Sequence, residues 1–424
     1  MREIKNIKPL HMVEIKTESK VYRGILLERP ELMDKKYIVI KLDSGYNIGI
    51  KKDRIIEIKD FGEIKKEKLN KRQRYNLRDD MPVVSIIATG GTIASRVDYL
   101  TGGVHSAFSA EELISAVPEL NSIAYIHGRQ IFNKFSENMQ PEDWVKIAKE
   151  VAREIRDKKS GIVITHGTDT MGYTAAALAF MIKTPLPIIL TGAQRSSDRG
   201  SSDAAINLIH STKVAGEADL GEVCVVMHET ISDDFSLIHP ATKVRKMHSS
   251  RRDAFQSINT KPIGRVSEKG IEFFLDVKRR GGRLELDTKL EKGVFLLKYH
   301  PGLKPQIIDK LLEMDYKGVV IEGTGLGHVS ENLFDSIRDA VNSGIVFCMT
   351  SQTINGRVNM NVYSTGRFLM NLGVIPCEDM LPETAYVKLM WVLGHTKKYE
   401  KVREMMLTNY AREISGKSYF DTLL

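Results

Sequence analysis

The feature that most constrains the fold is the largely apolar run at residues 83–88, which leads directly into Thr89-Gly-Gly-Thr92. Such a run, bounded by turn residues, is typical of a strand buried on both faces of a parallel sheet. Strand and helix patterns then alternate, with strands at 161–165, 187–191 and 222–227 and helices at 141–157, 171–182 and 202–215. This alternation predicts a doubly wound α/β domain.

A second α/β unit is predicted from residue 294 onward. Its expected strands are residues 294–299 and segments near Val319 and Ile345, and its expected helices lie near Ser330, near Glu383 and over 398–413. The pattern between residues 232 and 289 is less regular. We therefore expect two α/β domains with doubly wound parallel sheets, the first over residues 81–289 and the second over 290–424.

The N-terminal part of the chain has a different residue pattern. Five short runs rich in β-branched and aromatic residues are separated by turn residues, and they cover 12–17, 21–28, 37–42, 46–51 and 54–58. Five strands in so short a stretch predict a small all-β barrel over residues 1–60, because closure removes exposed edges. The strongly charged residues 61–80 that follow are expected to form a linker.

Charge is concentrated in this N-terminal part. The chain carries a net charge of +8, and residues 1–80 hold 21 Lys and Arg against 14 Asp and Glu, a net charge of +7. A basic module on a near-neutral body suggests an anionic partner such as nucleic acid, and a lysine-rich solvated surface is the alternative. Three scattered cysteines, no secretory segment and no apolar run of about 20 residues predict a cytoplasmic protein without a membrane span.

Two polar loops are expected at one edge of the first sheet, because ligands bind outside the carboxyl ends of strands in open α/β sheets. One is the Thr89–Thr92 loop, and the other runs from Thr165 to Thr170 and includes His166. Alone, the first loop fits a tight turn or a phosphate loop, and Thr168-Asp169 fits a helix N-cap. Two such loops at neighbouring strand ends favour a catalytic site, in which His166 would be a hydrogen-bonded support.

Threonine hydroxyls in such a site would need activation, since they are weak nucleophiles at neutral pH. A lysine held near Thr168 and Asp169 could supply it, although sequence spacing does not show which lysine. The sequence has no cluster with metal-ligand spacing, so no metal is expected. The glycine run at residues 323–327 lacks the full spacing of a dinucleotide-binding loop, and we discount it.

Both loops together resemble the signatures of the bacterial-type L-asparaginases. Ala-Thr-Gly-Gly-Thr-Ile-Ala at 88–94 is similar to that family's first signature, and Ile-Thr-His-Gly-Thr-Asp-Thr-Met at 164–171 is similar to its second. The resemblance covers about Pro82 to the C-terminus. It implies two α/β domains with the active site at the carboxyl edge of the first.

The resemblance also implies roles for individual residues. Thr92 would be the nucleophile, assisted by Tyr99, and Thr168, Asp169 and Lys246 would form a second catalytic group. Lys246 is identified because it lies nine residues before a phenylalanine, as the family's lysine does.

The same resemblance implies a binding site for the substrate's polar groups. Ser136 and Glu137 would hold its α-carboxylate and α-amino groups. Glu137 stands where many members of the family have glutamine, which leaves that contact open. Whether glutamine or asparagine is preferred, and which threonine attacks first, also stay open.

The basic N-terminal module departs from plain asparaginases and resembles that of the D subunits of archaeal glutamyl-tRNA(Gln) amidotransferases. This resemblance implies a glutaminase, or asparaginase-like, subunit that passes ammonia to a partner subunit, which uses ATP and Mg to convert Glu-tRNA(Gln) to Gln-tRNA(Gln). It implies no cofactor in this chain and a homodimeric core within a heterotetramer. The alternatives are a free-standing asparaginase with an accessory domain and a non-catalytic RNA-binding scaffold.

Overall fold

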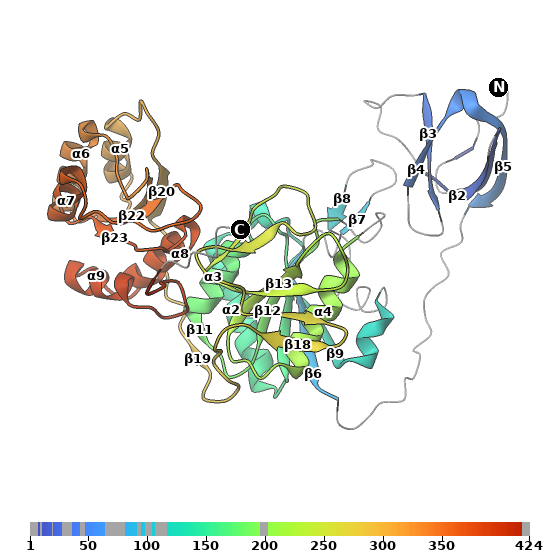
Figure 1. Cartoon of the computed structure of the whole chain (residues 1–424), viewed down its shortest axis with the longest axis horizontal. Coiled ribbons are helices and arrows are strands. Elements are labelled where there is room, and N and C mark those ends of the chain that lie inside the picture. The colour runs from blue at the N-terminus through green and yellow to red at the C-terminus, as the bar shows by residue number, and fades with distance from the viewer. Residues whose placement is uncertain are drawn as a thin grey trace.

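A computed structural model describes residues 7–8, 11–18, 20–27, 36–42, 47–63, 81–90, 95–97, 104–106, 117–195 and 202–417 of the chain. Near the N-terminus, five strands form one antiparallel sheet in the order β4-β3-β2-β1-β5, drawn in blue in Figure 1. Their bounds are β1 His11–Thr17, β2 Val21–Leu27, β3 Tyr37–Leu42, β4 Asn47–Lys51 and β5 Ile55–Glu63. The apolar side chains of alternate residues meet in a small core made by Val13, Ile15, Ile38, Ile40 and Ile50.

These strands follow the predicted runs closely, except that β5 continues beyond the predicted Ile58 to Glu63. The all-β character of the N-terminal part is therefore confirmed. Among the described residues, β4 and β5 are the two edges of the sheet.

The next part of the chain folds around an eight-stranded sheet with the order β18-β17-β14-β13-β12-β10-β6-β9. Its strands are β6 Val83–Ala88, β9 Tyr125–Gln130, β10 Gly161–Thr165, β12 Ile188–Thr191, β13 Val223–His228, β14 Ser236–Pro240, β17 Gly264–Ser267 and β18 Gly270–Phe273. The strands from β9 to β13 in this order are parallel, whereas β14, β17 and β18 are antiparallel. The predicted parallel sheet is thus extended to a mixed one by the segment that looked irregular in sequence.

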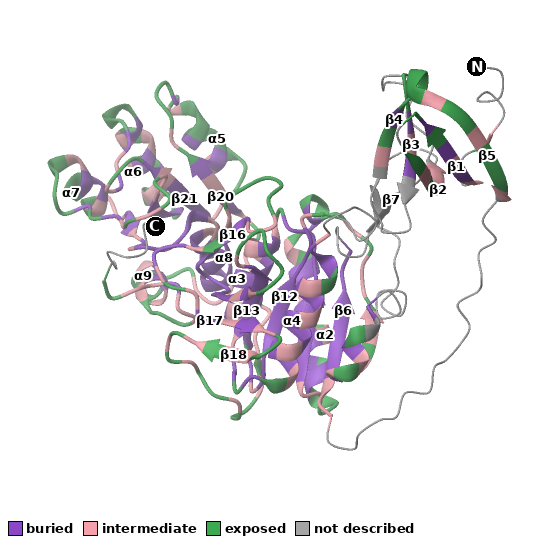
Figure 2. Ribbon diagram, turned by 45° about the vertical axis from the view of Figure 1, so that its right-hand side comes forward, coloured by how far each residue is buried: buried purple, intermediate pink, exposed green. Residues whose placement is uncertain are grey.

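Helices cover both faces of the parallel strands. On one face lie α2 (Pro141–Arg156) and α3 (Met171–Met181), and on the other lies α4 (Ala204–Glu217). Alternation along β10 explains the two cores, because Ile162 and Ile164 pack towards α2 and α3 while Val163 packs towards α4. Figure 2 shows the buried strands between the partly exposed helices. This three-layer arrangement confirms the predicted α/β class.

Short elements connect and flank these layers. They are the 3-10 turns η2 Lys52–Arg54, η4 Pro118–Ser122 and η5 Ser136–Asn138, and the paired strands β7 Ser95–Val97 with β8 Val104–Ser106, β11 Ile182–Lys183 with β19 Glu285–Leu286, and β15 Val244–Lys246 with β16 Phe255–Ser257. Of these pairs, β15 and β16 form a hairpin that stays outside the eight-stranded sheet.

The second α/β domain has a four-stranded parallel sheet with the order β20-β21-β22-β23. Its elements are β20 Val294–Lys298, α5 Gln306–Glu313, β21 Gly318–Gly323, η6 Glu331–Leu333, α6 Phe334–Asn342, β22 Val346–Ser351, α7 Ser364–Asn371, β23 Ile375–Pro376, α8 Pro382–Leu393 and α9 Tyr399–Leu407. One face of the sheet packs against α5, α6 and α7, and the other face packs against α8.

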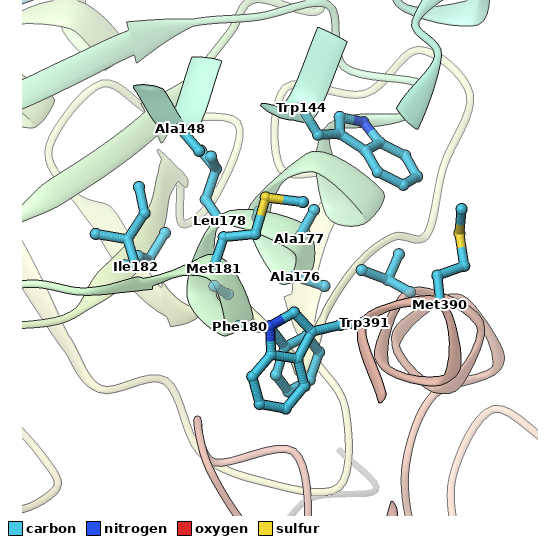
Figure 3. Packing of buried hydrophobic residues seen from close by; sticks show 14 of the residues in the cluster. Trp144, Ala148, Ala176, Ala177, Leu178, Phe180, Met181, Ile182, Met390 and Trp391 are labelled. Atoms are coloured by element: carbon cyan, nitrogen blue, oxygen red, sulfur yellow. The ribbon is translucent and has the colours of Figure 1, made fainter. Parts of the chain in front are cut away.

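The two α/β domains share a continuous apolar core through α3 and α8. Phe180 of α3 stacks on Trp391 of α8 with ring centroids 6.0 Å apart, as Figure 3 shows from close by. Helix α3 is apolar on all sides because it lies between the first sheet and α8. This contact joins the two domains at the C-terminal end of α3.

The last predicted helix is shorter than expected. The pattern predicts a helix over residues 398–413, but α9 ends at Leu407. The reason is Glu413, whose buried carboxylate accepts hydrogen bonds from the backbone N–H groups of Tyr410 and Ala411 and pairs with Lys388 at 2.6 Å. A loop folds around this carboxylate in place of a helical turn. Over the described residues, no helix has both the length and the apolar character that a membrane span requires.

Candidate active site

Four strands of the first sheet end at the same edge, level with one another. Thr165, the last residue of β10, pairs with Ala88 of β6 on one side and with Thr191 of β12 on the other. Ala88 pairs in turn with Gln130, the last residue of β9. The loops that follow these strands therefore emerge side by side at the carboxyl edge, where the sequence places the predicted site.

The structure brings together Thr168, Asp169 and Lys246. The ammonium group of Lys246 donates to the hydroxyl oxygen of Thr168 and to a carboxylate oxygen of Asp169, both at 2.8 Å. Thr168 is buried, the Lys246 side chain is only 14% exposed, and the Asp169 side chain is 67% exposed. A cation in this position orients the hydroxyl and stabilises negative charge on its oxygen, while solvent reaches the pair from the carboxylate side.

The loop after β6 is tied to the loop after β10. The buried hydroxyl of Thr89 donates to the carbonyl oxygen of Thr165 at 2.8 Å, and the backbone N–H of Thr89 bonds to the same oxygen. Gly90 has a φ of 108°, and a Cβ there would lie 2.3 Å from the carbonyl oxygen of Lys134. Any side chain at this position would collide with that carbonyl, so only glycine fits. The glycine of the signature therefore leaves room for the loop after β9 to pack against it.

Ser136 and Glu137 lie on that loop, in η5. Ser136 is buried, and its backbone carbonyl accepts a hydrogen bond of 2.7 Å from the Thr170 hydroxyl. A Cβ on Gly167 would lie 2.7 Å from the Cβ of Ser136, so Ser136 directly abuts the backbone just before Thr168. Glu137 is exposed. The predicted substrate-binding serine therefore lies beside the predicted catalytic loop.

His166 is a buried structural residue, as the sequence suggests. Its Nδ1 atom bonds to the carbonyl of Gly167 at 2.7 Å, and its Nε2 atom bonds to the hydroxyl of Thr174 at 3.0 Å. Burial lowers its pKa to about 4, so the imidazole is neutral at neutral pH. With Nδ1 donating to a carbonyl, Nε2 must accept from the hydroxyl. The ring therefore fixes the turn that presents Thr168.

Thr92 and Tyr99, the predicted nucleophile and its assistant, lie outside the described residues. The structure adds one supporting pair that the sequence reasoning did not identify. Lys134 forms an ion pair of 2.7 Å with Asp143, and the Asp143 carboxylate also accepts the backbone N–H of Gln140. This pair fixes the Ser136 loop to the start of α2. The acidic residue two positions after Pro141 is the available sequence signal, since it completes a capping box.

A cavity of about 680 Å³ lies away from this edge, between the two α/β domains. Its lining includes Thr184, Glu222, Trp391 and Arg412, and two of these residues precede the amino ends of β12 and β13. It is therefore separate from the candidate site. Within the described residues, no group of three His, Cys, Asp or Glu side chains is arranged to hold a metal ion.

Comparison with protein families assigns all three parts of the chain. Residues 83–279 match the asparaginase N-terminal domain, and residues 293–406 match the glutaminase/asparaginase C-terminal domain. Residues 7–60 match the GatD N-terminal domain. Together these matches cover well over half of the chain. The domain boundaries of 1–60, 61–80, 81–289 and 290–424 stay predictions.

Similar proteins extend over nearly the whole length. The D subunit of the glutamyl-tRNA(Gln) amidotransferase of Pyrococcus furiosus is 52% identical over 98% of this chain and 96% of its own, and the D subunit of the Methanothermobacter thermautotrophicus enzyme is 49% identical over 96% and 94%. Among solved structures, the thermostable L-asparaginase from Thermococcus kodakarensis is 34% identical, with a TM-score of 0.73 over 79% of this chain and all of its own. The chain belongs to the family of glutamyl-tRNA(Gln) amidotransferase D subunits, in which an asparaginase-type pair of domains follows an added N-terminal domain.

Proposed function

We propose that this chain is the glutaminase subunit of a tRNA-dependent amidotransferase, which releases ammonia from a side-chain amide and supplies it for the conversion of Glu-tRNA(Gln) to Gln-tRNA(Gln). The observation that carries the proposal is the contact of Lys246 with both Thr168 and Asp169 at the carboxyl edge of the sheet. The relatives named as D subunits of glutamyl-tRNA(Gln) amidotransferase support the destination of the ammonia.

In the proposed reaction, the Thr92 hydroxyl attacks the amide carbon of glutamine. The hydroxyl proton passes to a base, the carbon–nitrogen bond breaks, and the nitrogen leaves as ammonia after gaining a proton. The acyl group stays on Thr92 as an ester until water hydrolyses it to glutamate. Tyr99 assists the threonine, and Thr168, Asp169 and Lys246 act together on the proton and on the attacking water.

The substrate's other end is assigned to the loop after β9. We assign Ser136 to the α-carboxylate and Glu137 to the α-amino group. The buried position of Ser136 against Gly167 supports this assignment, because a ligand beside Thr168 would also face this serine. The exposed carboxylate of Glu137 suits an ammonium group.

The partner supplies the remaining chemistry in this proposal. The D subunit belongs to an amidotransferase complex in its relatives, and we place ATP and Mg on a separate kinase and transamidase subunit. We further propose a homodimeric core within a heterotetramer and a cytoplasmic location. The N-terminal sheet contacts either the tRNA or the partner.

A direct test measures ammonia release from glutamine by the full chain, alone and with its partner subunit and Glu-tRNA(Gln). The expected result is slow release by the isolated chain and a large increase in the complete mixture. Thr92→Ala should abolish release in both. Activity that survives Thr92→Ala combined with Thr168→Ala would show that the site lies elsewhere.

The second candidate function is a free-standing L-asparaginase, which the T. kodakarensis structure favours. The same assay separates the two, because fast asparagine hydrolysis that ignores the partner and the tRNA supports the free-standing enzyme. A non-catalytic RNA-binding scaffold, the third possibility, would release no ammonia from either amide under any of these conditions.

A further inference from the structure

Lys246 lies on a hairpin that is not part of the eight-stranded sheet. Among the described residues, strands β15 and β16 pair only with each other, through Val244 with Ser257 and Lys246 with Phe255. The hydrogen-bond ladders that align β6, β10 and β12 therefore do not place the Lys246 ammonium group against Thr168. Other contacts must hold the hairpin. One comes from the main sheet, where Nδ1 of His239 in β14 bonds to the Ser257 hydroxyl of β16 at 2.9 Å, and a buried set of contacts comes from the second α/β domain.

A buried ion pair anchors the residue just before the hairpin. The side chains of Lys243 and Asp379 are both fully buried, and Nζ of Lys243 lies 2.7 Å from Oδ2 of Asp379. The same ammonium group donates to the backbone carbonyl of Asp379 at 2.8 Å. The other carboxylate oxygen of Asp379 accepts the backbone N–H of Ser415 at 2.9 Å. Asp379 thus belongs firmly to the second domain and reaches the hairpin through Lys243.

Neighbouring residues reinforce this anchor on the same side. The Thr384 hydroxyl donates to the carbonyl of Thr242 at 2.7 Å, and Arg245 lies 3.2 Å from the Glu383 carboxylate. Lys243 and Arg245 thus contact the second domain, whereas Lys246 contacts Thr168 in the first. This agrees with the alternation of side chains along a strand. One short segment therefore bridges the two domains.

At the other end of the hairpin, Asn259 makes a further tie. Its side-chain amide donates to the carbonyls of Gly356 and Asp379, at 2.9 and 3.2 Å, and accepts the backbone N–H of Gly356. Asp379 is therefore bonded to residues on both sides of the hairpin.

We propose that the buried Lys243–Asp379 pair is a positioning device. Through it, the second domain holds the hairpin so that the Lys246 ammonium group stays within hydrogen-bond distance of Thr168. The inference rests on the catalytic role proposed for Lys246. Lys243 and Asp379 do not touch the reacting groups; they act through the backbone that carries Lys246. Desolvation lowers the pKa of Lys243, and the Asp379 charge opposes this, so removing either partner leaves an uncompensated buried group.

The test compares Asp379→Asn with the wild-type chain, assembled with its partner subunit and with glutamine as substrate. A displacement of about 1 Å at a catalytic group can cost about 100-fold, so we expect kcat to fall by about 10- to 100-fold. KM for glutamine should change little, because Ser136 lies on a different loop. Glu222→Gln is the matched control, since it breaks another interdomain ion pair, the 2.6 Å contact with Arg412, and should leave kcat unchanged.

A double-mutant cycle distinguishes positioning from general damage to the fold. If Asp379 acts through Lys246, then Asp379→Asn should cost little further activity once Lys246→Met has been made. If single variants fold poorly, Lys243→Met with Asp379→Leu removes both buried charges, and it should fold yet keep the low kcat. Circular dichroism at the assay temperature reports the folded fraction.

Two outcomes would overturn the inference: wild-type kcat in the folded Lys243→Met, Asp379→Leu variant, or a full and independent loss from Asp379→Asn in the Lys246→Met background. Failure of the proposed function looks different, because the wild-type chain would then release no ammonia from glutamine in the complete mixture. Failure of the catalytic role of Lys246 would show as wild-type activity in Lys246→Met alone.

Discussion

The ammonium nitrogen of Lys246 lies 2.8 Å from the hydroxyl oxygen of Thr168, although 78 residues separate them in sequence. Sequence spacing alone does not reveal this contact. Lys246 is identified as the catalytic lysine only from the family resemblance. Among the described residues, the contact identifies Lys246 as a cation placed against the Thr168 hydroxyl.

Removing the hydroxyl tests this contact directly. Thr168→Val keeps the shape of the side chain and deletes the oxygen, so we expect kcat for glutamine hydrolysis to fall by about 10²- to 10⁴-fold, the range for loss of acid–base assistance. Steady-state ammonia release gives the value. Thr168→Ser keeps the oxygen and should retain most of the activity. A valine variant within twofold of wild type would remove Thr168 from the mechanism.

Ser136 should affect binding more than chemistry. If its hydroxyl holds the substrate's α-carboxylate, Ser136→Ala removes one hydrogen bond to a charged group, worth about 1.5–3 kcal/mol. KM for glutamine should then rise by roughly 10- to 100-fold with kcat largely preserved. A lower kcat at unchanged KM would contradict the assignment. Glu137→Gln provides a comparison, because it removes only the charge of the exposed neighbouring carboxylate.

Substitution of Gly90 tests whether the glycine of the signature is needed for the Ser136 loop to pack in its position. Gly90 and Gly281 have similar backbone angles, with φ of 108° and 112°, but only Gly90 faces another backbone, the carbonyl of Lys134 at 2.3 Å from a Cβ. Gly281→Ala should cost about 1–2 kcal/mol through backbone strain alone. Gly90→Ala should cost at least about 1 kcal/mol more, through overpacking.

Denaturant unfolding of both glycine variants measures the difference. Equal losses of stability would show that the close approach to Lys134 is relieved without cost. A KM for glutamine raised only in Gly90→Ala would show in addition that the Ser136 loop has moved.

Strongly apolar strands were the most predictable part of the fold. The predicted bounds of β6 and β10 agree with the structure, because strands buried on both faces need continuous apolar runs. Strands β14, β17 and β18 were not predicted. They are four or five residues long and lie at one end of the sheet. Strand β14 is mostly buried, but Ser236, His239 and Pro240 interrupt the apolar run that would mark such a strand, and β17 and β18 are only partly buried.

The candidate site was predictable only in part, for a related reason. Local motifs identify loops such as 165–170, because the turn after a strand depends on the glycine and hydroxyl residues within the loop itself. The Lys243–Asp379 pair joins residues 136 positions apart, and each residue alone resembles an ordinary charged surface residue. Likewise, the helix predicted to reach residue 413 ends at Leu407 because a distant partner, Lys388, buries Glu413. Tertiary pairings of this kind cannot be predicted from the spacing of residues along the sequence.

Buried histidines predict how stability depends on pH. Burial lowers the pKa of His166 and His210 to about 4 and that of His239 to about 3. Below about pH 6.5, the unfolded chain binds protons at these histidines that the folded chain does not, so the free energy of unfolding falls as pH falls. The loss is at most about 1.4 kcal/mol per pH unit for each histidine, and it ends below the folded pKa.

His239→Asn isolates one of these contributions. His239 is fully buried and its Nδ1 atom bonds to the Ser257 hydroxyl at 2.9 Å, a contact that the asparagine amide can replace. Between pH 7 and pH 5, the variant should lose about 2 kcal/mol less stability than the wild type, since it lacks one titrating group. Carboxylates are common to both proteins and cancel in this difference. Urea unfolding at the two pH values gives the four free energies, and equal losses in both proteins would mean that His239 is protonated in the folded state.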